Sequence, residues 1–356
     1  MPRLAILLGA GGVGKTTLSA ALGLAHARAG TRAALLGVDP ARRLRSALAL
    51  ADLPEHGVAV ATDGPGSLAA ALLDPSTCLR RWVGEACPDT AERAALIANP
   101  FFVALADRLA GFSDAIGCVR AVEWAERDPA LSEIVLDTAP GIPAVELLAR
   151  PDKLMAFFDG RLIRWLTRFA RLSRLGVAAH GSRRTLTALA QLSGAGALRD
   201  FGELVSALDA AIATMIARLE RARGWLRDPR TAIIIACGIS DDAADAACAL
   251  DRAVRAHGFE PTLAVLNRVL PTSLAAWSPR LDAAPPAAHA FARYIESHLR
   301  IQHRVRAQLV AQHLPVLDIP DAATLDVADR LAGLAALGEP LRAALAAPAT
   351  VARQVG

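Results

Sequence analysis

The sequence predicts an α/β fold: a mostly parallel sheet flanked by helices, with an inserted helical subdomain. Three observations lead to this prediction. Short apolar runs recur along the chain, helical patterns alternate with them, and residues 151–228 show helical patterning without a convincing strand. Of the 356 residues, 53% are hydrophobic, which is ample for a large core, and the abundance of Ala and Leu favours helices.

The expected strands are short and almost wholly apolar, as in a parallel sheet that is buried on both faces. They span Leu4–Leu8, Arg32–Val38, Leu68–Leu73, Glu133–Leu136, Thr231–Ala236, Thr262–Leu266 and Leu314–Ile319. A helix is expected up to Ala29, where Gly30 supplies the C-terminal cap, and another over Asp241–His257. We therefore expect a core of residues 1–150 and 229–356, with residues 151–228 as the inserted helical subdomain.

The segment between the first strand and the first helix matches G-x-x-x-x-G-K-[ST] at Gly9, Gly14, Lys15 and Thr16. Glycines let successive backbone N–H groups turn toward one anion, and the helix start adds its positive dipole end. Lys15 is expected to reach the β- and γ-phosphates, and the Thr16 hydroxyl to bind Mg²⁺. This P-loop predicts a P-loop NTPase whose nucleotide contacts are Gly11, Gly12, Val13, Gly14, Lys15, Thr16 and Thr17.

Two aspartates directly follow predicted strands, where ligands of open α/β sheets bind. Asp39 opens the segment D-P-A-x-x-L, and Asp137 opens D-T-A-P. A P-loop needs such carboxylates near Mg²⁺ and near the attacking water before it can hydrolyse a nucleotide. Taken singly, either aspartate is equally compatible with a helix cap or a turn.

In this order and at this spacing, the loop G-x-G-G-V-G-K-T-T, D-P-A-x-x-L and D-T-A-P resemble the arsenical-pump (ArsA) ATPase family, which includes ATPases that deliver tail-anchored membrane proteins. The resemblance implies that Asp39, with Lys15, is catalytic and that Asp39 positions or deprotonates the attacking water. It implies that Asp137 holds the Mg²⁺ shell through water, and that Asn267 reads adenine and so favours ATP. Arg268, beside Asn267, and Pro315, in the last strand, complete the implied nucleotide site.

Position 10 departs from the family pattern, which usually has a lysine that acts on the nucleotide of a partner subunit. Here the residue is Ala10, so we expect intact binding but slow hydrolysis, unless another cation substitutes. Arg42 and Arg43 are candidates, although a solvated helix face is the more ordinary explanation of both. The departure also suggests a heterodimer with a paralogous ATPase that supplies the lysine, as an alternative to a homodimer.

The inserted stretch contains a basic amphipathic pattern over Phe158–Arg174, with apolar side chains on one face and arginines beside them. Such a helix can bind an anionic membrane surface or a hydrophobic client, such as a membrane protein. An ordinary helix packed by its apolar face gives the same pattern. Leu204–Ile216 has another apolar face, for which packing in the core is again the ordinary explanation.

The remaining features narrow the class of protein. The net charge of +4 is small, so no nucleic acid partner is expected, and the five cysteines include no C-x-x-C pair for a structural zinc site. No apolar run could span a bilayer, so we expect a cytoplasmic protein, with or without peripheral membrane contact. The sequence thus predicts an ATP- and Mg²⁺-dependent ATPase that switches a partner. The alternatives are a non-hydrolysing regulatory subunit of a heterodimer and a ParA/MinD-like partitioning ATPase.

Overall fold

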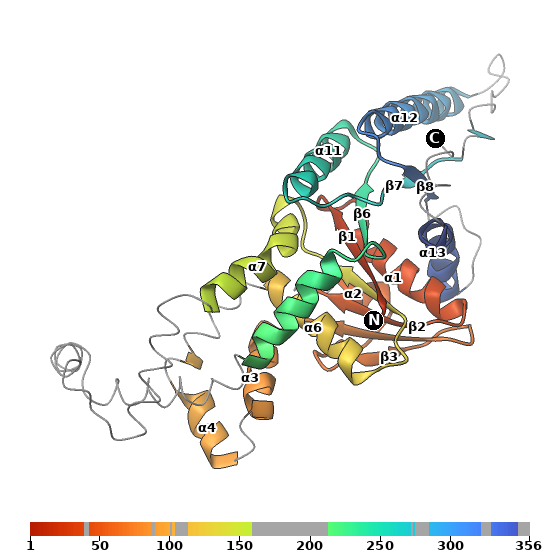
Figure 1. The fold of residues 1–356 in the computed structure, drawn as a ribbon. Coiled ribbons are helices and arrows are strands. Elements are labelled where there is room, and N and C mark those ends of the chain that lie inside the picture. The colour runs from red at the N-terminus through yellow and green to blue at the C-terminus, as the bar shows by residue number, and fades with distance from the viewer. Residues whose placement is uncertain are drawn as a thin grey trace. The chain divides into compact units, whose positions relative to one another are not determined.

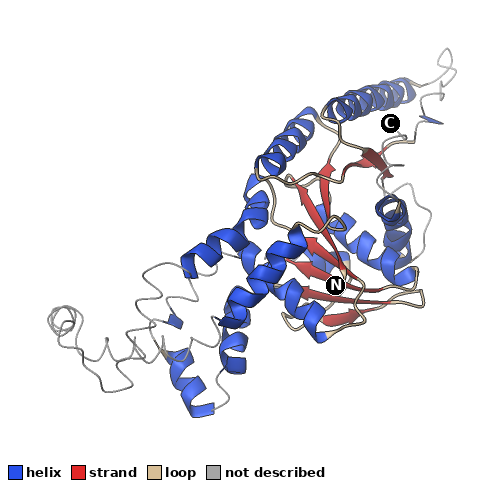
Figure 2. Ribbon diagram, in the orientation of Figure 1, coloured by secondary structure: helices blue, strands red, loops and turns tan. Residues whose placement is uncertain are grey.

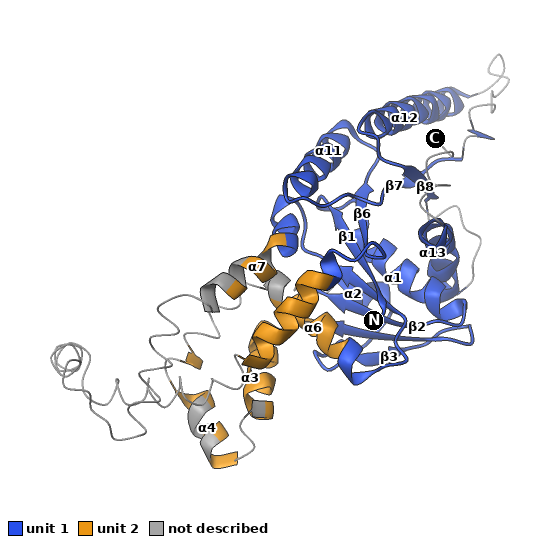
Figure 3. Cartoon of the chain, viewed as in Figure 1, with its two compact units in different colours: residues 1–72, 125–148, 225–356 blue, residues 73–124, 149–224 orange. Residues whose placement is uncertain are grey.

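The computed structural model describes residues 1–38, 43–86, 90–99, 102–103, 113–158, 213–271, 273–274, 285–321 and 329–347. The chain divides into two compact units, which Figure 3 shows in different colours. Unit 1 comprises Met1–Leu72, Ala125–Leu148 and Trp225–Gly356. Unit 2 comprises Leu73–Trp124 and Ala149–Gly224.

Unit 1 is built on an eight-stranded sheet of order β3-β4-β2-β5-β1-β6-β7-β8 (Figure 1). Its strands are β1 (Arg3–Gly9), β2 (Arg32–Gly37), β3 (Val58–Val60), β4 (Ser67–Leu72), β5 (Glu133–Asp137), β6 (Ala232–Cys237), β7 (Leu263–Val269) and β8 (Val316–Pro320). Every pairing is parallel except that of β3 with β4. The predicted α/β fold with a mostly parallel sheet is therefore confirmed, and β3 is a short antiparallel edge strand that its three residues did not reveal.

Both faces of this sheet are buried, which is why its central strands are apolar at nearly every position. One set of alternating side chains, including Leu7, Leu35 and Ile234, shares a core with α1 (Lys15–Arg28) and α13 (Arg330–Ala346). The other set, including Ile6, Leu36 and Ile235, is equally buried. There α11 (Asp241–Ala256) packs on β6 and β1. Helices thus flank the sheet, as Figure 2 shows.

The helices α1 and α13 touch at the level of their backbones. A Cβ atom at Gly338 would lie 2.0 Å from the carbonyl oxygen of Ala21, so only glycine fits at this crossing. The helix α1 ends as predicted, at Gly30 with φ of 87°. At the start of α11, the Ser240 side chain accepts a hydrogen bond from the Ala243 N–H.

The described residues of unit 2 are helical except for 73–74 and 99. They form α3 (Pro75–Ala86), α4 (Thr90–Ala98), most of α6 (Ser113–Arg127), the second part of α7 (Glu146–Phe158) and a helix over 213–226. Here the fully buried Glu123 carboxylate forms an ion pair with Arg120 at 3.0 Å and another with Arg81, and accepts a hydrogen bond from Trp82 at 3.3 Å. Two opposing guanidinium groups make this burial of a carboxylate tolerable.

Unit 2 includes residues 73–124 in addition to most of the predicted insertion. Apart from Phe158, the amphipathic stretch Phe158–Arg174 lies outside the described residues, and so do residues 204–212 of the stretch Leu204–Ile216. The boundaries 151–228 and the client role of this region therefore stay predictions. No helix in the described part of the chain is long and apolar enough to cross a membrane.

Candidate functional site

The predicted P-loop lies at the carboxyl edge of the sheet, between the end of β1 at Gly9 and the start of α1 at Lys15. Gly12 and Gly14 have φ of 82° and 95°, values that glycine adopts without strain. A Cβ atom at Gly14 would lie 2.2 Å from the Asn267 side chain, whereas one at Gly11 would meet nothing within 4 Å. The loop is thus tightly packed at its base and open at Gly11, where a ligand can approach the backbone.

The side chain of Lys15 is only 7% exposed, and its Nζ donates a hydrogen bond to the Ala10 carbonyl at 3.0 Å. This bond spans the loop from its last residue to its second. It places a buried positive charge within a ring of backbone groups, next to the positive end of α1. Thr16 and Thr17 follow on the first turn of α1 and are partly exposed.

Asp137 is the last residue of β5 and is 2% exposed. The parallel register sets it beside Leu7 of β1, close to where the P-loop begins. The Ser19 hydroxyl lies 3.1 Å from Asp137 Oδ1 and 3.0 Å from the Lys15 carbonyl, so its proton is shared between two acceptors. A carboxylate oxygen is thereby fixed against α1, one turn beyond Lys15.

The loop after Asp137 is tied to the strand that carries the P-loop. The Thr138 hydroxyl donates to the Leu7 carbonyl at 2.6 Å, and the Gly141 N–H donates to the Gly9 carbonyl at 2.9 Å. The Val38 N–H, at the end of β2, donates to the Asp137 carbonyl at 2.8 Å. Three strand ends are therefore linked by hydrogen bonds, although Asp39 itself, Arg42 and the rest of 39–42 lie outside the described residues.

The end of β7 brings Asn267 to the P-loop from 254 positions further along the chain. The Asn267 side chain is 4% exposed, and its Nδ2 donates to the Val13 carbonyl at 2.8 Å. The next residue, Arg268, is exposed and has φ of 63°, in the left-handed region. The structure thus assigns Asn267 a role in holding the loop, while its contact with adenine stays a prediction.

Pro315 does not join this site. It precedes β8, and its carbonyl accepts a hydrogen bond from the Ala264 N–H near the start of β7. This is the amino edge of a parallel sheet, and five-residue strands separate it from the carboxyl edge by ~17 Å. The apolar motif around Pro315 predicted the strand correctly, but Pro315 lies at the end of that strand that is remote from the P-loop. We therefore leave Pro315 out of the site.

A family model described as an anion-transporting ATPase, ArsA_ATPase, matches residues 3–313. This chain belongs to the ArsA ATPase family. A curated relative, ATPase GET3 from Malassezia globosa, is 30% identical over 152 residues. That alignment covers 41% of this chain and 41% of the relative, so the chain spans less than half of that protein's length in the match.

Asp137 and Thr16 offer a carboxylate and a hydroxyl, which are hard oxygen ligands of the kind that Mg²⁺ prefers. The thiols of Cys78, Cys118, Cys237 and Cys248 are all buried. Burial raises the pKa of the Cys237 thiol to about 12, so it is protonated and unreactive at neutral pH. Among the described residues, no cluster of His, Cys, Asp and Glu could hold a metal ion by itself.

Sequence reasoning missed three residues of this ArsA-family site: Ser19, Thr138 and Gly141. Their hydrogen bonds to Asp137, Leu7 and Gly9 connect the P-loop to the loop after β5. For Ser19 a signal existed, because it is a polar residue four positions after Lys15 on a helix whose buried positions, apart from Lys15 and His26 near its two ends, are otherwise Ala, Leu or Gly. Thr138 and Gly141 stand within the segment that Asp137 opens, but nothing in their spacing indicated their acceptors.

Proposed function

We propose that this ArsA-family chain is a Mg²⁺-dependent ATPase that uses its nucleotide state to switch a partner. One observation carries the proposal: the buried Lys15 of the glycine loop lies one helical turn before Ser19, whose hydroxyl binds the buried carboxylate of Asp137. A buried cation beside an open backbone ring suits phosphates. A fixed carboxylate near the phosphate site suits the Mg²⁺ ion that accompanies nucleotide phosphates.

In the proposed reaction, the backbone N–H groups from Gly11 to Gly14 and the Lys15 ammonium bind the phosphates. Thr16 and Asp137, the latter through water, would hold Mg²⁺, which offsets the negative charge of the phosphates when bound. Asp39 orients the attacking water and accepts its proton, and Asn267 with Arg268 contacts the adenine side of the nucleotide.

The proposed switch starts from the loop after β5. Because Gly141 and Thr138 bond to Gly9 and Leu7, a shift at the P-loop is transmitted to the segment that continues into η2 (Ile142–Val145). This short helix packs against α11. The partner is a second copy of the chain or a paralogous ATPase, and the client is a membrane protein or another hydrophobic segment. The expected cytoplasmic location stays a prediction.

Steady-state ATP turnover by the purified chain tests the proposal. We expect phosphate release that requires Mg²⁺, stops with a chelator, and is lost in Asp39→Asn while ATP binding remains. Lys15→Ala should lose binding as well. If the wild type fails to bind Mg·ATP under conditions where it is folded, the proposal is wrong. Trapping Asp39→Asn with ATP in native lysate then identifies the partner by mass spectrometry.

Ala10 supports a second candidate function, a non-hydrolysing regulatory subunit. Its backbone carbonyl is occupied by Lys15, and its methyl side chain cannot act on the nucleotide of a partner subunit. In this case the chain alone binds ATP but shows background turnover, and a paralogue that carries the missing lysine restores hydrolysis. Brisk turnover by a pure homodimer or monomer excludes this candidate.

A further inference from the structure

The end of β7 is held from two sides, by the P-loop and by α12 (Pro286–Ala311). On one side, Asn267 Nδ2 donates to the Val13 carbonyl at 2.8 Å. On the other side, three residues later, Leu270 is bound by the side chain of Gln302, which belongs to α12. The segment from Asn267 to Leu270 is therefore fixed at both ends while its middle residue Arg268 is exposed.

Gln302 is an unusual residue for its position. The buried face of α12 is otherwise apolar, with Ile295, Leu299, Val305 and Leu309, yet Gln302 is only 4% exposed. Its Oε1 accepts from the Leu270 N–H at 2.9 Å, and its Nε2 donates to the Leu270 carbonyl at 3.2 Å. The amide thus pairs with both backbone groups of one residue, as a neighbouring strand would. A buried amide without such partners would destabilise the fold.

Between these two anchors the backbone is strained. Arg268 has φ of 63°, which a non-glycine residue adopts at a cost, and the register of β7 against β8 shifts between Asn267 and Val269. Such a conformation persists only where the surroundings over-determine it. Here the surroundings are the bond of Asn267 to Val13 before the strained residue and the double bond of Leu270 to Gln302 after it.

We propose that Gln302 is a positioning residue for the base side of the nucleotide. By clamping Leu270, it keeps Arg268 in the left-handed conformation and keeps Asn267 against the P-loop, so that α12 controls the surface that meets the base. The phosphate side depends instead on the backbone N–H groups of Gly11–Lys15, whereas the Asn267 side chain bonds the Val13 carbonyl. This inference rests on the proposed nucleotide binding at the P-loop, and it predicts that base affinity and phosphate affinity can be separated.

Calorimetric binding of Mg·ATP and of Mg·tripolyphosphate, which has no base, tests this separation. Gln302→Met keeps the length of the side chain but removes both hydrogen bonds to Leu270. We expect it to weaken ATP binding about tenfold, while tripolyphosphate binding changes by less than about twofold. The control is Gln308→Met on the same helix, whose amide binds Asp245 at 2.8 Å and not β7, and which should change neither. General damage to the fold would weaken both ligands.

A pair of substitutions at the exposed Arg268 tests the backbone directly and does not depend on how well Gln302→Met folds. Arg268→Gly and Arg268→Val both remove the guanidinium, but only glycine adopts positive φ without strain. We expect Arg268→Val to bind ATP several-fold more weakly than Arg268→Gly, with equal binding of tripolyphosphate. In the Arg268→Gly background, Gln302→Met should lower the ATP affinity by a smaller factor than it does in the wild type.

The outcomes separate the two proposals. A folded wild type that binds neither ligand overturns the proposed function. A wild type that binds both, with Gln302→Met equal to wild type or with equal losses for ATP and tripolyphosphate, overturns the positioning role of Gln302. Equal ATP affinity of Arg268→Gly and Arg268→Val overturns it as well.

Discussion

The two edges of the sheet in unit 1 bury polar side chains in opposite ways. At the carboxyl edge, each buried polar group has a hydrogen-bond partner at close range: Lys15 binds Ala10, Ser19 binds Asp137, and Thr138 binds Leu7. At the amino edge, His26 of α1 and Glu133 of β5 approach no closer than 3.8 Å. In the part of the chain that the structure describes, His26 Nε2 has no hydrogen-bond partner.

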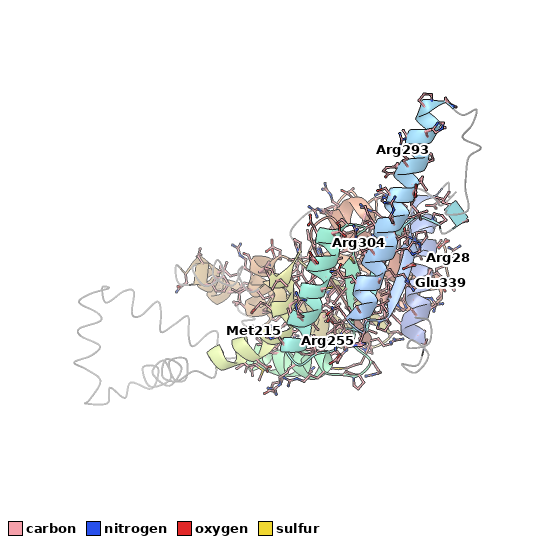
Figure 4. The ribbon with its side chains drawn as sticks, turned by 90° about the horizontal axis from the view of Figure 1, so that it is seen from above. Arg28, Met215, Arg255, Arg293, Arg304 and Glu339 are labelled. Atoms are coloured by element: carbon pink, nitrogen blue, oxygen red, sulfur yellow. The ribbon has the colours of Figure 1, made fainter. Side chains whose placement is uncertain are left out.

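At the amino edge, burial shifts both groups toward their neutral forms. Burial, helped by Arg342 and Arg3, lowers the pKa of His26 to about 4, against the opposing effect of Glu339. Burial raises the pKa of Glu133 to about 7, although Arg3 acts against this. These charges come from α13, where Glu339 and Arg342 bind each other, and from Arg3 of β1. Figure 4 also shows Arg28 of α1 close to Glu339.

The carboxyl edge is therefore preorganised for a ligand, whereas the amino edge carries an electrostatic cost. The carboxyl edge is organised before any ligand arrives, since its polar groups already hold one another. The amino edge stores an electrostatic cost, because two ionisable groups are kept neutral by burial. One helix, α1, joins the two edges, with Lys15 at its start and His26 near its end. The following predictions separate the two edges, from the largest expected effect to the smallest.

The carboxyl edge should lose its ligand when Lys15 is replaced. Lys15→Ala removes the charge that meets two phosphates, so we expect a loss of ATP affinity on the order of a thousandfold, about 4 kcal/mol. Isothermal titration with Mg·ATP measures the loss. His26→Gln, at the other end of α1, is the control and should leave ATP affinity within about twofold of wild type. A similar loss in both variants would show that the edges are not independent.

At the amino edge, opposite pH dependences should cancel in the wild type. The raised pKa of Glu133 stabilises the fold fully below pH 4.5, and this stabilisation is lost as the pH rises to about 7. The lowered pKa of His26 has the opposite effect, because stability present above pH 6.5 is lost as the pH falls toward 4. Between these limits, folding takes up one proton at Glu133 and releases one at His26.

Single substitutions should expose each slope. As the pH rises from 4.5 to 7, the unfolding free energy of His26→Gln should fall by about 3 kcal/mol relative to wild type. As the pH rises from 4 to 6.5, that of Glu133→Gln should increase by about as much. Urea unfolding followed by tryptophan fluorescence at several pH values measures both. Parallel curves for the three proteins would refute the neutral pair.

The contact between α1 and α13 should transmit damage to both edges. Gly338→Ala places a methyl group 2.0 Å from the Ala21 carbonyl, so the helices must separate, and we expect about 2 kcal/mol of destabilisation. A modest loss of ATP affinity should accompany it, because α1 begins in the P-loop. Gly224→Ala is the control, since a Cβ there meets nothing within 4 Å and should stabilise its helix by about 0.5 kcal/mol. Thermal unfolding of the two variants shows whether the loss of stability comes from the contact with Ala21 or from the replacement of a helical glycine as such.

The smallest expected effect belongs to Ser19→Ala. It removes the hydroxyl that fixes Asp137 but leaves the carboxylate and the P-loop in place. We expect a stability loss of about 1 kcal/mol and a two- to threefold higher Mg²⁺ concentration for half-maximal ATP turnover, in proportion to one hydrogen bond. Titration of the metal at saturating ATP measures the second effect. An unchanged metal requirement would mean that Ser19 does not position Asp137 for Mg²⁺.

Much of the fold followed from the sequence because its signals are local. Each central strand is a continuous apolar run, and the P-loop is a contiguous pattern whose glycines, lysine and threonine have fixed mechanical roles. What the sequence did not reveal depends on contacts between distant segments. The bond of Asn267 to Val13 joins residues 254 positions apart, and the clamp of Gln302 on Leu270 depends on where α12 lies. Pro315 was misassigned because a motif identifies a strand but not which of its ends reaches the ligand.

The crossing of Gly338 with Ala21 also has a consequence for the order in which the protein is made. Roughly 300 residues separate the two positions, so the ribosome has synthesised α1 long before α13 exists. At ordinary elongation rates, this interval lasts on the order of 15–60 seconds. During that time the face of α1 that α13 will cover, including Ala21, has no native partner, so the nascent chain exposes apolar surface there. The helix that carries the phosphate loop is thus among the first to emerge and among the last to be completed.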